Sequence, residues 1–257
     1  PTITCPTDVT ISTAPGTCDA TANWTVPAGS DNCSGATVTG TANPGDTFPK
    51  GTTTVTYTVT DAAGNTATCA FDVIVEDTEL PTLICPVNIT VGTDPTVCEA
   101  AVNWVPPVPI DNCPDVELTS THNPGDIFPK GTTTVTYTVT DCGGSVVTCS
   151  FDVTVEDTEL PVLNCLADIT VSTDPGVCTA AVNWIPPVPT DNCPDVTVTG
   201  SANPGDTFPT GTSTVTYTAT DCGGNVVTCS FDVIVEDANA PTIACPGDVF
   251  AVTDAGV

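Results

Sequence analysis

The sequence predicts an all-β chain of tandem β-sandwich modules, of the immunoglobulin or fibronectin type III kind, arranged end to end. Three observations lead to this prediction. A pattern of 80 residues occurs three times and then begins again; short runs of β-branched and aromatic residues alternate with polar ones; and clusters of turn residues separate these runs. No stretch shows the apolar period of a capped amphipathic helix.

The repeat is clearest in the cysteines and tryptophans, which recur every 80 residues. Equivalent residues are Cys5, Cys85, Cys165 and Cys245, and Trp24, Trp104 and Trp184. A fixed period of this length indicates one folding unit used several times. We therefore expect modules at 1–80, 81–160 and 161–240, followed by the first strand of a fourth module at 241–257.

Within each repeat, the strands are marked by a period of two. In the segment TTTVTYTVTD, Val55, Tyr57 and Val59 share one face and threonines share the other. The segment CAFDVIVED continues the pattern with the apolar residues of 71–75. This alternation is typical of a strand with one buried face. Eighty residues is small for a sandwich, so we expect a thin core that depends on covalent cross-links.

The composition excludes several classes of partner. The chain has 257 residues, 31 of them acidic against two lysines, and a formal net charge of −29. Such a chain repels nucleic acid and anionic lipid surfaces, so neither is expected as a partner. Its 40% hydrophobic content is too high for a disordered acidic chain. It has no apolar run long enough to insert into a membrane.

Fifteen cysteines at regular positions indicate an oxidising compartment, outside the cell or at its surface. A metal–thiolate protein would need closely spaced CxxC-type clusters. Cys142 and Cys149, the nearest pair, are seven residues apart. We therefore expect disulfides.

Several motifs together resemble the hyalin repeat (HYR) family. They are P-x-I-x-C-P at 1–6, the strand with Trp24, DNC at 31–33, FPKGTTTVTYTVTDAAGN at 48–65, and C-x-F-x-V-x-V at 69–75. The match covers all three repeats and the beginning of the fourth. The resemblance implies an immunoglobulin-like sandwich that occurs in tandem in extracellular adhesion and matrix proteins and in bacterial surface proteins. It implies no enzymatic activity.

Four cysteines per repeat allow three pairings, and the sequence alone does not choose among them. The resemblance implies a bond between the first and last strands: Cys5–Cys69, Cys85–Cys149 and Cys165–Cys229. The remaining cysteines would then pair within each repeat: Cys18–Cys33, Cys98–Cys113 and Cys178–Cys193.

Three cysteines are left over. Cys142 and Cys222 lie in the last hairpin turn of repeats 2 and 3, where repeat 1 has Ala62, and Cys245 belongs to the incomplete fourth module. We expect these to be unpaired thiols, exposed or half-exposed. The alternative is a bond from Cys142 or Cys222 to a neighbouring chain.

Acidic residues are expected to gather where one module meets the next. The first set is Asp46, Asp77, Glu79, Asp111 and Asp141, and the second is Asp126, Asp157, Glu159, Asp191 and Asp221. Converging carboxylates suit Ca²⁺, which takes six to eight oxygen ligands. The alternative is that these acids are solvated and keep the chain soluble.

Candidate sites for glycosylation or catalysis do not follow the 80-residue repeat. Asn23, Asn32 and Asn88 fit the acceptor pattern for N-glycosylation, but none recurs across the repeats. His122 is the only histidine and has alanine at the equivalent positions, so no repeated catalytic or zinc site is expected.

The sequence favours a structural, extracellular fibre or stalk, a segment of a longer array or polymer in which the chain's partner is itself. One alternative is a cell-surface adhesin that binds a glycan or protein ligand. The other is a spacer region of a secreted enzyme. Loops that differ little between repeats and contain almost no aromatic residues favour the scaffold.

Overall fold

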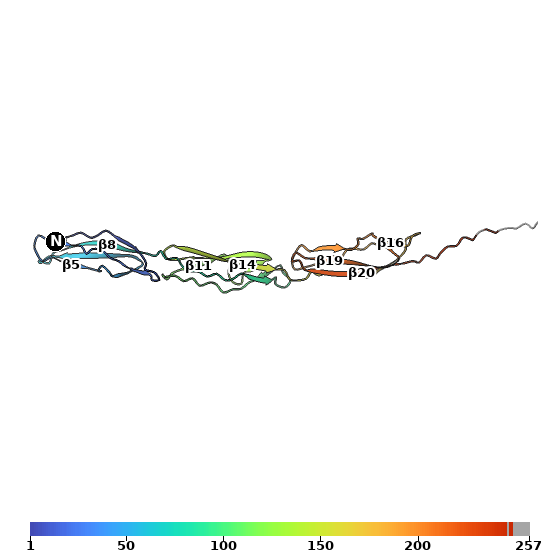
Figure 1. The fold of residues 1–257 in the computed structure, drawn as a ribbon, viewed down its shortest axis with the longest axis horizontal. Coiled ribbons are helices and arrows are strands. Elements are labelled where there is room, and N and C mark those ends of the chain that lie inside the picture. Colours follow the sequence, from blue (N-terminus) through green and yellow to red (C-terminus); the bar gives the residue numbers. More distant parts are fainter. Residues whose placement is uncertain (246, 249–257) are drawn as a thin grey trace, which may run out of the picture. The chain divides into compact units, whose positions relative to one another are not determined.

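The computed structural model describes residues 1–245 and 247–248, which contain twenty β-strands and no helix (Figure 1). The all-β prediction is confirmed. Contacts divide the chain into two units. Unit 1 comprises Pro1–Val91 with Glu99–Val155, and unit 2 comprises Gly92–Cys98 with Glu156–Val257. We call residues 1–80, 81–160 and 161–240 repeats 1, 2 and 3.

Repeat 1 is a small sandwich built on one four-stranded sheet. Its strands are β1 (Thr2–Ile3), β2 (Val9–Ser12), β3 (Asp19–Thr21), β4 (Gly29–Ser30), β5 (Thr37–Gly40), β6 (Thr47–Pro49), β7 (Gly51–Thr60) and β8 (Thr66–Glu76). The sheet order is β2-β8-β7-β5, with β2 parallel to β8 and the other pairs antiparallel. Two short antiparallel pairs, β3-β6 and β1-β4, complete the repeat.

Repeats 2 and 3 have the same plan. Repeat 2 contains β9 (Ile89–Gly92), β10 (Glu99–Ala101), β11 (Glu117–Ser120), β12 (Ile127–Pro129), β13 (Gly131–Thr140) and β14 (Val146–Glu156). Repeat 3 contains β15 (Ile169–Ser172), β16 (Thr179–Ala181), β17 (Thr197–Gly200), β18 (Thr207–Pro209), β19 (Gly211–Thr220) and β20 (Val226–Glu236). Isolated bridges, Thr82 with Ile110 and Val162 with Thr190, replace the β1-β4 pair.

The long hairpin β7-β8 carries the core, because its alternation places one face inward along ten paired residues. Val55, Tyr57 and Val59 are buried, as the sequence pattern predicts. The β3-β6 pair covers this face and contributes Ala20 and Phe48.

A tryptophan joins the two layers in every repeat. In repeat 1 the Trp24 indole N–H donates to the Tyr57 hydroxyl at 2.9 Å, and its ring meets Phe71 edge-on at 5.3 Å. The same hydrogen bond links Trp104 to Tyr137 and Trp184 to Tyr217. A buried indole N–H needs such a partner. This core leaves both ends of each repeat to be closed by loops.

The fourth module was expected to begin with a strand over 241–257. Residues 241–245 and 247–248 lie outside any strand. The rest of that expectation falls on residue 246 and residues 249–257, which lie outside the described residues. Within the described part, no helix is long and apolar enough to cross a membrane.

Candidate functional site at the joint between repeats

The DNC motif forms a tight turn that presents its cysteine. In repeat 2, Oδ2 of Asp111 accepts a hydrogen bond from the backbone N–H of Cys113 at 3.1 Å. The equivalent turns of repeats 1 and 3 have the same bond at 3.0 Å. A short aspartate side chain that bonds the backbone two residues ahead closes a turn without help from a sheet. The turn therefore has the same form in all three repeats.

A second cysteine lies in the loop between β2 and β3 of repeat 1. The backbone N–H of Ala14 donates to the carbonyl of Asp19 at 2.7 Å, and that of Thr17 donates to Ala14 at 3.0 Å. These bonds bend the loop and place Cys18 at its end. The equivalent loops of repeats 2 and 3 carry Cys98 and Cys178.

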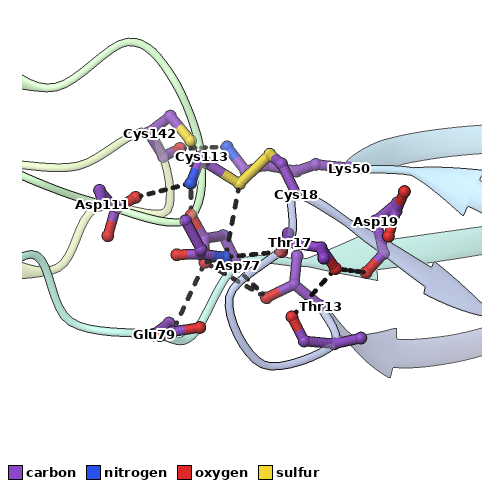
Figure 2. Close-up of a disulfide and its surroundings, with 12 residues drawn as sticks. Thr13, Thr17, Cys18, Asp19, Lys50, Asp77, Glu79, Asp111, Cys113 and Cys142 are labelled. Carbon is purple, nitrogen blue, oxygen red and sulfur yellow. Dashed lines mark hydrogen bonds between the residues drawn. A yellow bond between two sulfur atoms is a disulfide. The ribbon is translucent and has the colours of Figure 1, made fainter.

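A disulfide joins the loop of one repeat to the turn of the next. Cys18 is bonded to Cys113 within unit 1, and Cys98 to Cys193 within unit 2, each with a sequence separation of 95 residues. We call the region around Cys18–Cys113 joint 1 (Figure 2) and the region around Cys98–Cys193 joint 2. The bonds between first and last strands are Cys5–Cys69, Cys85–Cys149 and Cys165–Cys229, as the resemblance implied.

The predicted pairing of the remaining cysteines within each repeat, Cys18–Cys33, Cys98–Cys113 and Cys178–Cys193, is therefore wrong. In repeat 2, the Cys113 turn faces the Cys18 loop of repeat 1, whereas the Cys98 loop bonds the Cys193 turn of repeat 3. The two cysteines of one repeat thus face different neighbours and cannot meet. Cys33 and Cys178 carry exposed thiols.

An asparagine side chain forms hydrogen bonds across each joint. The Nδ2 group of Asn112 donates to the backbone carbonyl of Thr17 at 2.9 Å, to Oδ1 of Asp77 at 3.2 Å and to Oγ1 of Thr13 at 3.3 Å. In joint 2, Asn192 donates to Val97 at 3.0 Å and to Thr93 at 3.1 Å. The middle residue of the DNC motif therefore recognises the loop of the preceding repeat.

Three aspartates converge at each joint. Carboxylate oxygens of Asp77, Asp111 and Asp141 lie within 4.8 Å of one another in unit 1. Those of Asp157, Asp191 and Asp221 do the same in unit 2. Asp77, Asp141 and Asp157 are each only 5% exposed. Two like charges at this distance repel by roughly 3 kcal/mol at an effective dielectric constant of 20. The clusters therefore attract positive charge.

Several oxygens of these clusters are buried without a hydrogen-bond partner. In joint 1 they are Oδ1 of Asp111, Oδ1 of Asn112 and Oδ2 of Asp141. In joint 2 they are Oδ2 of Asp157, Oδ1 of Asp191 and Oδ1 of Asn192. Buried polar atoms are almost always satisfied, by protein, water or an ion. Both joints thus present oxygen ligands that the protein itself does not use.

The remaining predicted ligands lie outside the clusters. Asp46 accepts the backbone N–H of Asn43 at 2.7 Å, inside its own turn, and Asp126 does the same for Asn123. Glu79 accepts the N–H of Gly16 at 3.0 Å, and Glu159 accepts that of Thr96 at 3.2 Å. The carboxylates of these four acids accept backbone N–H groups, so only three of the five residues in each predicted set lie together.

Lys50 brings a positive charge to joint 1, which the sequence did not indicate. Its Nζ donates to the backbone carbonyl of Cys142. The pKa of Lys50 is raised chiefly by a side-chain hydrogen bond with Cys142 and further by attraction to Asp77 and Asp141, whereas burial acts to lower it. The lysine offsets part of the negative charge of the cluster.

Asp221 in joint 2 accepts a side-chain hydrogen bond from Asn225, at a position where repeat 2 has Ser145. Asn225 donates from both its backbone and its side chain to Asp221, and its side chain also reaches the backbone carbonyl of Asp157. Burial acts to raise the pKa of Asp221, but the bonds from Asn225 and Gly223 outweigh it, so the pKa is lowered. Asp221 therefore remains a carboxylate at neutral pH.

Of the three extra cysteines, which were expected to be exposed or half-exposed, Cys142 has the most contacts with a joint. It is half-buried in joint 1, and its thiol donates to Oδ2 of Asp77 at 3.5 Å. Cys222 is exposed at the equivalent turn, and Cys245 carries an exposed thiol. The three candidate glycosylation residues, Asn23, Asn32 and Asn88, are all exposed.

Comparison with known proteins identifies the repeats. The family model of the HYR domain matches residues 1–75, 76–155 and 156–235. The chain belongs to the HYR domain family. Hyalin of Strongylocentrotus purpuratus is 37% identical over 270 residues, covering all of this chain and 22% of the hyalin. Hyalin of Lytechinus variegatus is 34% identical over 268 residues, covering all of this chain and 51% of that protein. The chain thus spans about a fifth of one hyalin and half of the other.

Solved structures show only a weak likeness to this HYR chain. A Drosophila N-cadherin EC1-3 structure is 12% identical, with a TM-score of 0.37, over 91% of this chain and 99% of that one. A protocadherin gammaB7 EC3-6 structure is 14% identical, with a TM-score of 0.35, over 92% of this chain and 74% of that one.

Three residues of joint 1 were not predicted from the sequence: Asn112, Thr13 and Lys50. A signal was present for the asparagine, because it is the invariant middle residue of DNC in the three repeats. Lys50 has no such signal, since repeat 3 has Thr210 at the equivalent position.

Peptide mapping under non-reducing conditions tests the joint directly. We expect a peptide linking Cys18 to Cys113, with Cys33 recovered as an alkylated thiol, and the Cys5–Cys69 peptide as an internal control. Replacing Cys18 and Cys113 together by serine should destabilise the region that they close by up to about 4.7 kcal/mol, the chain-entropy value for a loop on the order of 100 residues. Recovery of a peptide linking Cys18 to Cys33 would show that the joint is not covalent.

Proposed function

We propose that this chain is a structural segment of an extracellular or cell-surface protein, in which HYR repeats are locked to one another to form a scaffold. The carrying observation is the disulfide between neighbouring repeats, Cys18–Cys113, and its counterpart Cys98–Cys193. Most tandem modules are joined by a linker alone, and relative motion is then the default. A covalent bond beside the linker restricts that motion.

Other contacts at the joint support the same role. Asn112 bonds three acceptors of repeat 1, two of which lie on its cysteine loop. Gly143 packs so closely that a Cβ atom there would lie 2.4 Å from the backbone carbonyl oxygen of Asp77. A contact of this kind tolerates little sliding or bending, which suits a stiff element better than a flexible tether.

The relatives support the extracellular assignment. Two are hyalins, and a third, from mouse, is named "Sushi, von Willebrand factor type A, EGF and pentraxin domain-containing protein 1", 35% identical over 61% of this chain and 4% of its own length. Disulfides persist in oxidising compartments, which agrees with this location. We further propose that the chain builds fibres or longer arrays with itself as partner, and that it has no catalytic role.

The scaffold function is tested by removing the covalent tie at one joint. In the variant Cys18→Ser with Cys113→Ser, we expect small-angle scattering to report a broader distribution of radii of gyration than in the wild type. The matched control, Cys5→Ser with Cys69→Ser, removes a disulfide inside repeat 1 and should leave this distribution unchanged. Equal distributions in all three proteins would argue against a joint stiffened by its disulfide.

Adhesion is the second candidate, because repeat 2 exposes apolar side chains in one region. Val105 and Val108 are 84% and 78% exposed, and the bridge between Thr82 and Ile110 brings Ile84, which is 86% exposed, alongside their segment. Exposed apolar patches mark interaction sites in many soluble proteins. On this alternative, the chain should bind spots on a glycan or matrix-protein array, and Val105→Ser with Val108→Ser should abolish the binding. The scaffold function does not require binding to any glycan or matrix protein on the array.

We also propose that each joint binds one Ca²⁺ ion. Three carboxylates and the Asn112 amide oxygen supply hard oxygen ligands, and three of these residues carry a buried oxygen with no other partner. Ca²⁺ binds oxygen ligands at roughly 2.3–2.6 Å, so it would draw these oxygens together and neutralise the repulsion between the carboxylates. Proteins with calcium sites outside the cell often bind with dissociation constants of roughly 10⁻⁴–10⁻³ M.

Calorimetric titration of the metal-stripped chain tests this site. We expect two ions per chain, and the variant Asp111→Asn with Asp141→Asn should retain only one. Glu117→Gln, which removes one exposed charge from β11 of the same repeat, serves as the control and should still bind two. If the double variant binds calcium like the wild type, the ion does not occupy joint 1, and the scaffold proposal is unaffected.

A further inference from the structure

Joint 1 contains three cysteines where its disulfide uses only two. The Sγ atoms of Cys142 and Cys113 and a carboxylate oxygen of Asp77 lie within 4.8 Å of one another. Cys113 is already bonded to Cys18, whereas Cys142 carries a thiol (Figure 2). A thiol held beside a disulfide is the arrangement from which exchange proceeds, because the thiolate attacks a disulfide sulfur directly.

We propose that Cys142 is an exchange thiol that moves the disulfide of joint 1 from between two repeats to within one. The Cys142 thiol loses its proton to solvent, and its sulfur forms a bond to Sγ of Cys113. The Cys18–Cys113 bond breaks, its electron pair remains on Sγ of Cys18, and that sulfur takes up a proton from solvent. One disulfide and one thiol are present before and after, so no external oxidant or reductant is needed.

The surroundings give the sulfur atoms room to rearrange. A cleft of about 920 Å³ in unit 1 is lined by Cys18, Lys50, Asp77, Cys142 and Gly143, among other residues. Cys113 by contrast is only 2% exposed. The attacked sulfur, Sγ of Cys113, therefore stays fixed in its turn. The attacking residue, Cys142, and the residue that is released, Cys18, both border the cleft.

The arrangement recurs at joint 2, which is the second observation in its favour. The Sγ atoms of Cys222 and Cys193 and a carboxylate oxygen of Asp157 again lie within 4.8 Å of one another. Repeat 1, by contrast, has Ala62 at this position, and its Cys33 is not disulfide-bonded. In this chain the extra cysteine thus occurs in the two repeats whose DNC cysteine is disulfide-bonded, and not in the third.

Exchange would convert a covalent joint into one held by the linker and by non-covalent contacts alone. The new bond, Cys113–Cys142, lies inside repeat 2. Cys18 would then carry a thiol at the edge of the cleft, open to reaction with other thiols or disulfides. The inference does not depend on the scaffold or calcium proposals, because it concerns only the connectivity of three sulfur atoms.

The first experiment asks whether Cys142 can bond Cys113. In the full chain with Cys18→Ser, oxidation by glutathione disulfide should produce a Cys113–Cys142 disulfide, with release of two glutathione thiols. Adding Cys142→Ala, the residue found in repeat 1, should leave Cys113 as a thiol or a mixed disulfide with glutathione. If Cys113 remains unbonded to Cys142 in the single variant, the sulfur atoms cannot meet and the proposal is overturned.

The second experiment follows exchange in the wild-type chain. After incubation at a fixed, slightly alkaline pH, acid quenching, alkylation and peptide mapping should recover Cys113–Cys142 together with alkylated Cys18. The rate should not change on dilution, because the reaction is intramolecular, and Cys142→Ala should abolish the product. A Cys18 that is never alkylated, or products that link Cys33, Cys178 or Cys245 at a rate that rises with protein concentration, would contradict the proposal.

Discussion

The structure depends on a shared boundary between neighbouring repeats, where a cysteine loop meets a DNC turn. Neither element has a sheet partner of its own, and each is shaped by a few local backbone bonds. The Cys18–Cys113 disulfide and Asn112 join them, and the cysteine of the turn becomes 2% exposed. A small sandwich with a thin core thereby gains buried surface and a covalent tie at its ends, where its own strands provide neither.

The same boundary gathers charge that the rest of the molecule avoids. Away from the joint, Asp46 accepts a nearby backbone N–H within its own turn. At the joint, Asp77 and Asp141 are buried together, and the positive charge of Lys50 offsets only part of their negative charge. A carboxylate removed from water is stable only with hydrogen bonds or a counter-charge. This imbalance is the physical basis for proposing a cation at the joint.

Differences between the three repeats are informative because they fall at this boundary. Repeats 2 and 3 have Cys-Gly at 142–143 and 222–223, where repeat 1 has Ala62 and Ala63. The glycine is explained by space, since a Cβ atom at Gly143 would lie 2.4 Å from the carbonyl oxygen of Asp77, and one at Gly223 would lie 2.6 Å from that of Asp157. The Cys142 thiol bonds to Asp77 and lies beside a disulfide, and this position is the feature that calls for a chemical role.

Much of the fold was predictable from the sequence because local chemistry determines it. The alternation of Val55, Tyr57 and Val59 with threonine specifies a strand with one buried face, and the 80-residue period specifies how often it recurs. The gathering of Asp77, Asp111 and Asp141 where two repeats meet was also predicted. The sequence could not indicate that Asp46 and Glu79 would be occupied by backbone N–H groups, because that depends on loop geometry.

The pairing of the second set of cysteines shows the limit most clearly. In a repeating chain, Cys33 and Cys113 occupy the same position in identical motifs, so Cys18 has two equivalent partners and spacing does not distinguish them. Only the tertiary structure decides, because it places the loop and the turn of one repeat against different neighbours. The sequence by itself determined the strands, the period and the residues that a joint contains. Which repeat each residue meets was decided in space, since a disulfide requires two sulfur atoms about 2 Å apart and is indifferent to their distance along the chain.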